Sequence, residues 1–371
     1  MKIKLIQPAM LQRPMDTKLK TRMSPSLALL TIANLTSKEH EVNIENENVE
    51  KIDFNEPVDL VAITVTVDVM NRAVEISKEF QNRGVTVIAG GIHITADPEG
   101  AVDSFDAISV GMAERVWTKI LKDKENNSLK KIYYDMENIT GKEIISPDYE
   151  IIDNKKYLYT NIISTSRGCP FQCDFCYNSC KNVLKTYINR PIDQVIKDIN
   201  ALKTRHIMFI DDNFIGDPKW TKNLLKEIKP LQLKWNAAVT SNIVDMPELL
   251  DEMKESGCQS LFIGFESINS KSLESVHKVQ NSVSRYEKLV EEAHKRGIMI
   301  NASFVFGLDE DDVSVFRSTL EWVVKNKIET VTSHILTPYP GTKLYSSLLE
   351  DNRIVDFNLS NYKKPLLAQW S

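Results

Sequence analysis

Short apolar runs alternate with longer amphipathic stretches along most of the chain, a pattern typical of parallel α/β proteins. In the first third, apolar runs predict five strands, at residues 2–7, 41–44, 59–66, 85–89 and 106–110. Helical spacing between and after them predicts helices at residues 24–38, 70–83 and 114–124. Five such strands joined by crossovers predict a flavodoxin-like (Rossmann-type) parallel sheet.

The alternation resumes with a longer period after a polar, irregular stretch. The predicted strands cover residues 160–164, 206–210, 234–239, 260–264, 299–306 and 330–336. The predicted helices cover residues 191–203, 219–228, 246–255, 282–295 and 312–326. Six strand–helix units predict a partial (β/α)6 TIM-type barrel, whose chemistry would lie at the carboxyl ends of its strands. The expected organisation is residues 1–135, a linker at 136–157, a barrel at 158–345 and a short C-terminal extension at 346–371.

Composition narrows the class of protein. A chain of 371 residues with 42% hydrophobic residues suits two globular domains. Its net charge of −5 and the absence of a basic block argue against a nucleic-acid partner. No apolar run approaches a membrane span, and the N-terminus has no signal-peptide core. Five cysteines without a disulfide framework indicate a reducing compartment, so we expect a cytoplasmic protein without a membrane partner.

Three cysteines fall within eight residues, at Cys169, Cys173 and Cys176. Structural zinc sites and ferredoxin-type clusters use four protein ligands, so three thiolates favour a 4Fe–4S cluster with one open iron. Cys180 could supply a fourth ligand and close the cluster, and a zinc knuckle is a further alternative. Cys258 follows a helical pattern in Ser-Gly-Cys and is expected to be a small buried residue.

The spacing of these cysteines resembles the C-x3-C-x-aromatic-C signature of the radical SAM superfamily. The resemblance implies that the cluster binds S-adenosylmethionine (SAM) at its open iron and cleaves it to a 5′-deoxyadenosyl radical. A carboxylate such as Glu266 would then hold the SAM ammonium by a charge-assisted hydrogen bond. The residues implied for SAM binding are Phe175, Tyr177, Ser241, Gly264, Glu266, Ser267, Arg285, Phe306 and Gly307.

Several of these positions have other readings. Arg285 lies on a predicted helix, where an arginine is often solvated, and Gly264 to Ser267 could be a helix-capping segment at a strand end. The acidic pair Asp211 and Asp212 follows the second barrel strand. It could act as a general base, contact a ribose or serve only as loop structure.

Pro338-Tyr339-Pro340-Gly341-Thr342 resembles a segment of the subgroup of radical SAM enzymes that carries an N-terminal cobalamin-binding domain. The N-terminal half of the chain also resembles that domain. Its short motifs resemble the glycine loops there: Gly90-Gly91-Ile92-His93, Pro98-Glu99 and Gly111-Met112-Ala113-Glu114. Glycines let the backbone approach a flat ligand closely. The residues implied for cobalamin are Thr64, Thr66, Gly90, Gly91, His93, Gly111 and Glu114.

The chain departs from this pattern in two places. No Asp-x-His-x-x-Gly motif is present to ligate cobalt, and His93 could be structural. Gly-Met-Ala-Glu also matches the usual acidic loop only in part.

The resemblance as a whole implies a radical SAM enzyme, a cobalamin-dependent C-methyltransferase acting on an unactivated carbon. The alternatives are a non-methylating rearrangement, cyclisation or oxidation, and a non-enzymatic cluster or corrinoid carrier. The expected partners are a small-molecule or peptide substrate and an electron donor such as flavodoxin or ferredoxin.

Overall fold

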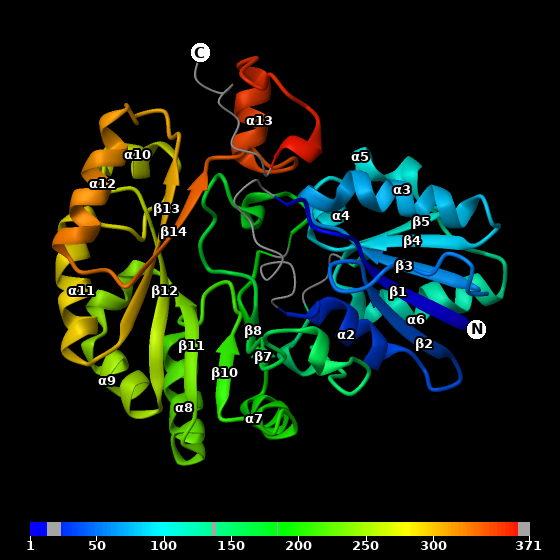
Figure 1. The fold of residues 1–371 in the computed structure, drawn as a ribbon, viewed down its shortest axis with the longest axis horizontal. Helices are drawn as coiled ribbons and strands as arrows, with labels where there is room; N and C mark the ends of the chain where they lie inside the picture. Colours follow the sequence, from blue (N-terminus) through cyan, green and yellow to red (C-terminus); the bar gives the residue numbers. More distant parts are fainter. Residues whose placement is uncertain (13–23, 136–138, 184, 363–371) are drawn as a thin grey trace.

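The computed structural model describes residues 1–12, 24–135, 139–183 and 185–362, which form two parallel sheets with helices packed against them (Figure 1). The N-terminal sheet has the order β2-β1-β3-β4-β5-β6, which is the flavodoxin order with one strand added at the edge. Its strands are β1 Lys2–Gln7, β2 Glu41–Asn46, β3 Leu60–Thr64, β4 Thr86–Gly90, β5 Ala107–Gly111 and β6 Ile132–Asp135.

The α/β class is confirmed, but the prediction of five strands in this sheet was wrong by one. β6 pairs in parallel with β5, with Ile108 opposite Ile132. Its four residues, Ile-Tyr-Tyr-Asp, alternate in burial only as an edge strand does, and polar sequence surrounds them. So short a segment carries no clear period, and only its pairing with β5 identifies it as a strand.

Helices cover both faces of the N-terminal sheet, which explains why β3 is an almost continuous apolar run. α3 (Met70–Gln81) packs on one face through apolar residues spaced three and four apart. α2 (Leu27–Leu35) and α6 (Ala113–Glu125) pack together on the other face. The short helices α4 (Ile92–Ala96) and α5 (Pro98–Ala101) occupy the connection between β4 and β5.

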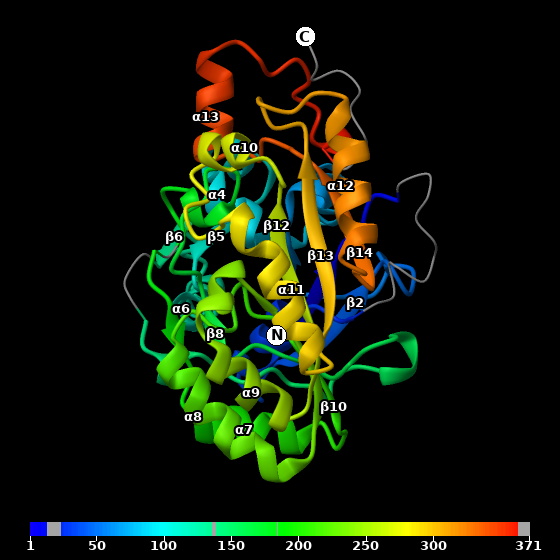
Figure 2. The ribbon, with the colours of Figure 1, turned by 90° about the vertical axis from the view of Figure 1, so that its left-hand side faces the viewer.

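The second sheet has the predicted six strands, in the order β14-β13-β12-β11-β10-β7. They are β7 Ile162–Ile163, β10 His206–Phe209, β11 Lys234–Val239, β12 Cys258–Glu266, β13 Met299–Phe306 and β14 Thr330–Ile335. The helices between them are α7 Ile192–Ala201, α8 Pro218–Ile228, α9 Pro247–Glu255, α11 Tyr286–Lys295 and α12 Ser314–Lys325. Figure 2 shows α8, α9 and α11 on the outer side of this sheet. This arrangement is an open (β/α)6 barrel.

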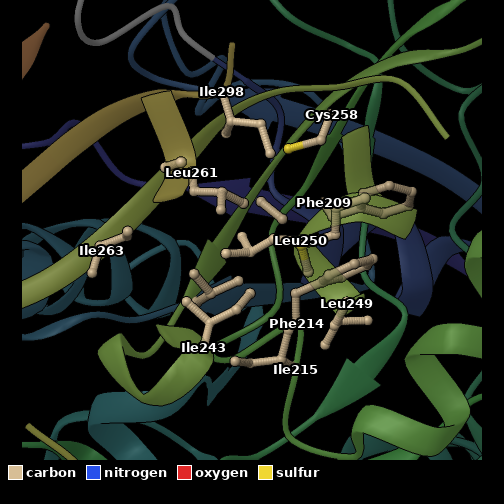
Figure 3. Close-up of a cluster of buried hydrophobic side chains, with 14 of the residues drawn as sticks. Phe209, Phe214, Ile215, Ile243, Leu249, Leu250, Cys258, Leu261, Ile263 and Ile298 are labelled. Atoms are coloured by element: carbon tan, nitrogen blue, oxygen red, sulfur yellow. The ribbon is translucent and has the colours of Figure 1, made fainter. Parts of the chain in front are cut away.

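The barrel core lies between the sheet and these helices. Phe209 at the end of β10 contacts Phe214 and Trp235, with ring centroids 4.9 and 5.6 Å apart. Cys258 is fully buried in this core beside Leu261 and Ile298, as Figure 3 shows, so its predicted role as a small buried residue is confirmed. Its thiol is therefore not available as a metal ligand.

A short antiparallel pair, β8 (Ser166–Arg167) with β9 (Ile188–Asn189), closes the base of the loop that carries the three clustered cysteines. After β14 the chain forms α13 (Lys343–Glu350), which lies above this loop in Figure 1. Residues 136–138 of the predicted linker and 363–371 of the predicted C-terminal extension lie outside the described residues. Within the described part of the chain, no helix has the length and apolarity needed to cross a membrane.

Candidate active site between the two sheets

The three clustered cysteines lie on one loop between β8 and a single 3-10 turn at Tyr177–Ser179. Cys173 is buried, while Cys169 and Cys176 are half-buried. Burial raises the pKa of the Cys169 thiol to about 11 and that of Cys176 to about 12. Each of these thiols also feels the charge of Cys173, so the three sulfur atoms form one electrostatic group.

The donor set suits a cluster better than a single ion. Within the described ranges, no three His, Cys, Asp or Glu side chains lie close enough together to hold one metal ion. A four-iron cluster is wider, because each thiolate binds a different iron atom. Three cysteines on one loop, each able to bind a different iron atom, fit the predicted 4Fe–4S cluster.

Cys180 lies beyond the 3-10 turn and is fully buried. Burial raises the pKa of its thiol to about 11, and the charges that act on it are those of Lys185 and Asp97. Lys185 also feels the charges of both Cys180 and Cys176. The open three-cysteine cluster therefore stays a prediction, with the closed four-cysteine cluster as its alternative.

The segment Pro338–Thr342, singled out in the sequence, packs against the cysteine loop. The rings of Tyr177 and Tyr339 stack with centroids 5.2 Å apart and an angle of 10° between their planes. The first turn of α13 continues the contact, because the Leu344 N–H donates to the carbonyl of Asp174 over 3.0 Å. One segment, residues 338–344, which is distant in sequence from the cysteine loop, thus holds the loop in place.

Glu266 ends β12 in an unusual backbone conformation, with φ at 62° and a bulge in its pairing with β13. Its carboxylate forms a buried ion pair with Lys278. A Cβ atom at Gly264 would lie 2.4 Å from Glu266 Oε1, so a side chain there would displace this carboxylate. The Lys278 ammonium lies 5.7 Å from the centre of the Phe175 ring, which brings the pair next to the cysteine loop.

Residues 276–281 contribute side chains that the sequence analysis missed. Gln280 Nε2 donates to Cys173 Sγ over 3.5 Å, and Gln280 Oε1 is buried without a hydrogen-bond partner among the described residues. Asn281 donates to the carbonyls of Gly264 and Phe265, and Ser241 donates to Asn281 over 2.8 Å. The unpaired oxygen of Gln280 is available to accept a hydrogen bond from a ligand. No sequence motif marked this segment.

Other residues predicted to bind SAM have partners of their own. The exposed Arg285 pairs with Asp245 at the surface, so the structure does not bring it to Glu266. Ser267 Oγ accepts from the N–H of Asn269 over 3.0 Å. The Phe306 ring packs on Phe316 with centroids 5.0 Å apart. Gly307, with φ at 97°, donates its N–H to Asp311 over 3.1 Å and lines a hollow under α13.

The acidic pair after β10 divides into two environments. Asp211 is buried and accepts four hydrogen bonds of 2.6–3.1 Å, from the backbone N–H and hydroxyl groups of Thr165 and Ser166. Its carboxylate therefore ties β10 to the turn before β8. These bonds support the interpretation of Asp211 as a structural residue of its loop. Asp212 instead lines a cavity with its surface exposed. The protein around it reduces the solvation of its carboxyl group and so raises its pKa.

We expect Asp211→Ala to lower the free energy of unfolding by roughly 2–4 kcal/mol, because it leaves four donors without their charged acceptor. Asp212→Ala is the matched control and should change stability by about 0.5 kcal/mol at most, since that side chain is exposed. Urea unfolding of both variants measures the difference. Equal stability of the two variants would remove Asp211 from its structural role.

A cavity of about 240 Å³ opens at the carboxyl ends of β3, β4 and β5, between α2 and α6. Its walls are mostly apolar, but the hydroxyls of Thr31 and Ser109 are buried there without a hydrogen-bond partner among the described residues. The residues predicted for cobalamin that line it are Thr64, Gly90, Gly91, Gly111 and Glu114. The cavity therefore suits an apolar group that also carries hydrogen-bonding atoms.

A second cavity of about 380 Å³ lies between the two sheets and shares its inner wall with the first. Gly91 and Gly111 line it from the N-terminal sheet, and Arg167 and Asp212 line it from the barrel. Glu114 Oε1 lies 3.9 Å from the Arg167 guanidinium and links the two sides. The paired cavities thus run from the N-terminal sheet to the base of the cysteine loop.

Two of these glycines are required by their surroundings. Gly91 has φ at 109°, and a Cβ there would lie 2.8 Å from backbone atoms of Val65. Gly111 has φ at 92°, and a Cβ there would lie 2.0 Å from the carbonyl oxygen of Asp135. Because Asp135 belongs to β6, the strand that the sequence analysis missed explains the second glycine.

Thr66 and His93, also predicted for cobalamin, line neither cavity. The Thr66 hydroxyl donates to Asp68 over 2.7 Å. His93 is 1% exposed, its Nδ1 has no hydrogen-bond partner among the described residues, and burial lowers its pKa. This burial favours the interpretation of His93 as a structural residue over its role as a cobalt ligand.

Comparison with known proteins identifies the family. Residues 163–323 match the family described as the radical SAM superfamily. Bacteriochlorophyllide d C-12(1)-methyltransferase of Chlorobaculum tepidum is 30% identical over 349 residues, which cover 91% of this chain and 76% of that protein. Hopanoid C-2 methylase of Rhodopseudomonas palustris is 24% identical over 350 residues, covering 89% and 65%.

Solved structures agree on the fold. The radical SAM methyltransferase TsrM of Kitasatospora setae, with cobalamin and a [4Fe-4S] cluster bound, superposes with a TM-score of 0.75 at 17% identity. That match covers 95% of this chain and 78% of TsrM. The cobalamin-dependent radical enzyme OxsB, with aqua-cobalamin bound, gives a TM-score of 0.69 at 18% identity, covering 94% and 55%. With its three-cysteine loop, its open barrel and these relatives, the chain belongs to the radical SAM superfamily.

Proposed function

We propose that this protein is a cobalamin-dependent radical SAM methyltransferase that methylates a carbon atom of a small substrate. The observation that carries the proposal is the pair of adjoining cavities that links the glycine loops of the N-terminal sheet to the cysteine loop of the barrel. The names of the bacteriochlorophyllide and hopanoid relatives, both methyl-transferring enzymes, support the reaction. The cobalamin bound to TsrM supports the second cofactor.

In this proposal, residues 1–135 are the cobalamin-binding domain, residues 158–345 are the radical SAM barrel, and residues 136–157 connect them. When bound, the cluster supplies the electron that cleaves SAM, and the corrinoid supplies the methyl carrier. An external protein must provide the reductant. The residues of this chain hold these groups, orient them toward one another and limit the access of water.

The barrel side binds the cluster and SAM. Cys169, Cys173 and Cys176 ligate the cluster and leave one iron open for SAM. Glu266 accepts hydrogen bonds from the SAM ammonium, and the neighbouring Lys278 offers a cation to the SAM carboxylate. Because Lys278 already contacts the carboxylate, Glu266 is held in position at the end of β12 before SAM arrives.

Two further groups complete the SAM side. The free oxygen of Gln280 is a second acceptor close to Cys173. Phe175, on the cysteine loop, has its ring centre 5.7 Å from the Lys278 ammonium and offers an apolar face to the ligand. Arg285 has no part in this arrangement, because its guanidinium is bound to Asp245 at the surface.

The N-terminal side binds the corrinoid. The cavity between α2 and α6 accepts its apolar tail, and the hydroxyls of Thr64, Thr31 and Ser109 offer hydrogen bonds to that tail. Gly91 and Gly111 let the ring approach the backbone at the entrance. His93 lies outside the cavity lining, so the proposal includes no protein ligand to cobalt.

An anaerobic assay tests the function. The protein is reconstituted with iron and sulfide, reduced, and given SAM and candidate substrates, with and without hydroxocobalamin. We expect both 5′-deoxyadenosine and S-adenosylhomocysteine, with methylated product formed only when the corrinoid is present. Substrate turnover with 5′-deoxyadenosine alone would contradict methylation.

That second outcome would favour a cyclisation or oxidation. One relative, the anaerobic magnesium-protoporphyrin IX monomethyl ester cyclase of Rubrivivax gelatinosus, keeps this candidate open. It is 24% identical over 360 residues, which cover 87% of this chain and 64% of the cyclase. Product mass distinguishes the two reactions, because a methylated product gains one carbon and a cyclised product does not.

A further inference from the structure

An open groove borders the outer side of the cysteine loop. It lies between Gln172, Ser179, Lys181 and Lys185 on one side and the start of α13 on the other. Three exposed lysines line it: Lys181 and Lys185 come shortly after Cys180, and Lys343 begins α13. Glu350, at the other end of α13, is the one carboxylate among the described residues of the groove lining. We call this surface the lysine groove.

In the part of the chain that the structure describes, the ammonium groups of Lys181 and Lys185 lack close counterions, and that of Lys343 has only a distant one. No carboxylate among the described residues pairs with Lys181 or Lys185, and Lys185 donates to the carbonyls of Asn178 and Cys180. Lys343 lies 4.0 Å from Asp174, whose carboxylate is already bound by His277 at 2.6 Å. Burial lowers the pKa of Lys185, and the nearby positive charge of Lys343 contributes.

This local excess of positive charge contrasts with the net charge of −5 of the whole chain. Surface lysines elsewhere, such as Lys229 and Lys295, form ion pairs of 2.6 and 2.8 Å with glutamates. Unpaired like charges gathered at one place repel one another, and this repulsion is relieved when an acidic partner binds. The lysine groove therefore suits an anionic surface.

The groove also lies directly against the proposed cluster site. Gln172, in its wall, is the chain neighbour of Cys173. Ser179, also in the wall, donates to the carbonyl of Cys176 over 2.8 Å and accepts from the N–H of Lys343 over 3.1 Å. A partner seated in the groove would be separated from the cysteines by little more than the backbone of their own loop.

We propose that the lysine groove is the docking site of an acidic electron-transfer protein that reduces the cluster. The inference rests on the proposed function, since it requires a cluster on Cys169, Cys173 and Cys176. The reduced partner gives up one electron, which enters the cluster; the partner is oxidised and no bond forms or breaks. Electron-transfer contacts are small and weak, so charge at their rim mainly accelerates association.

The test variant is Lys343→Glu. Lys181 is left in place because it also lines the cavity between the two sheets, which belongs to the proposed active site. Lys185 is left in place because its ammonium supports two carbonyls of the cysteine loop. The matched control is Lys229→Glu, which makes the same change of charge at an ion-paired lysine just after α8. Equal iron and sulfide content of all three proteins establishes that the cluster site is intact.

Two measurements follow, with a flavodoxin as the acidic probe. Calorimetry at low and at physiological salt gives its dissociation constant without any turnover. Formation of 5′-deoxyadenosine is then driven either by reduced flavodoxin or by dithionite, which needs no docking site. We expect the test variant to lose at least about tenfold in flavodoxin affinity and in flavodoxin-driven rate, with the dithionite-driven rate unchanged.

Every other result would contradict either the inference or the proposed function. Equal loss with both reductants would overturn the inference and assign Lys343 to an anionic substrate. Loss in neither measurement, or equal loss in the control, would also overturn it. If no protein cleaves SAM with dithionite, the proposed function fails, and the binding measurement still decides whether the lysine groove binds the acidic partner.

Discussion

Replacing Cys173 with alanine is expected to abolish cluster binding and SAM cleavage. Two thiolates cannot hold a cluster that three hold, and Cys173 is the buried cysteine whose sulfur accepts a hydrogen bond from Gln280. Formation of 5′-deoxyadenosine should fall by at least about a hundredfold, beyond the loss that outer partners of metal ligands cause. Iron content, the visible absorbance of the cluster and 5′-deoxyadenosine yield measure the effect.

Cys180→Ala is the control for this experiment. Cys180 is fully buried in the same segment, beyond the 3-10 turn that follows Cys176. This variant should keep its iron and most of its SAM cleavage. If Cys180→Ala loses the cluster as Cys173→Ala does, the four-cysteine alternative replaces the open cluster.

Replacing Gly90 with valine should abolish cobalamin binding while leaving SAM cleavage intact. A Cβ at Gly90 meets only atoms of Ser109, at 3.7 and 3.9 Å, so the backbone tolerates a side chain. The valine methyl groups would then occupy part of the 240 Å³ cavity. Corrinoid retained after gel filtration, and affinity for hydroxocobalamin measured by calorimetry, should both fall by about a hundredfold, the effect of losing roughly 3 kcal/mol of contacts.

Gly90→Ala is the matched variant, because one methyl group at ordinary contact distance leaves most of the cavity open. It should retain cobalamin within a fewfold of the wild type. Circular dichroism and thermal unfolding show whether the valine variant is folded, since overpacking typically costs about 1–3 kcal/mol. Unchanged corrinoid binding in a folded Gly90→Val protein would remove the cavity from the proposed cobalamin site.

The regular elements could be predicted because their signals are local. The apolar run of β3 and the three-and-four spacing in α3 arise from burial against the sheet, and burial leaves its period in the sequence. β6 has only four residues at a sheet edge, too few to show a period, so its assignment depends on pairing with β5. β3 and α3 could be predicted because they are long enough and buried enough to show a period, whereas β6 is short and lies at a sheet edge.

The residues of the candidate site also fall into two groups: those that a local motif reveals and those that only the fold brings together. The three clustered cysteines are spaced on one loop, so a local motif revealed them, and Glu266 follows a strand end in a short signature. Lys278 and Gln280 carry no motif, and they reach the cysteine loop only because the chain folds back after β12. Arg285 comes soon after them in the chain, yet its guanidinium pairs with Asp245 at the surface. Proximity in sequence therefore did not decide which of these side chains joined the site.

The sequence by itself determined the α/β class, the three-cysteine motif and the two glycine loops, because each is written in neighbouring residues. Tertiary structure decided which polar groups meet: Asp211 became a structural acceptor, His93 was buried outside both cavities, and Lys181 and Lys343 came together beside the cysteine loop. Such encounters depend on packing between segments far apart in the chain, and burial and charge at these contacts leave no period in the sequence.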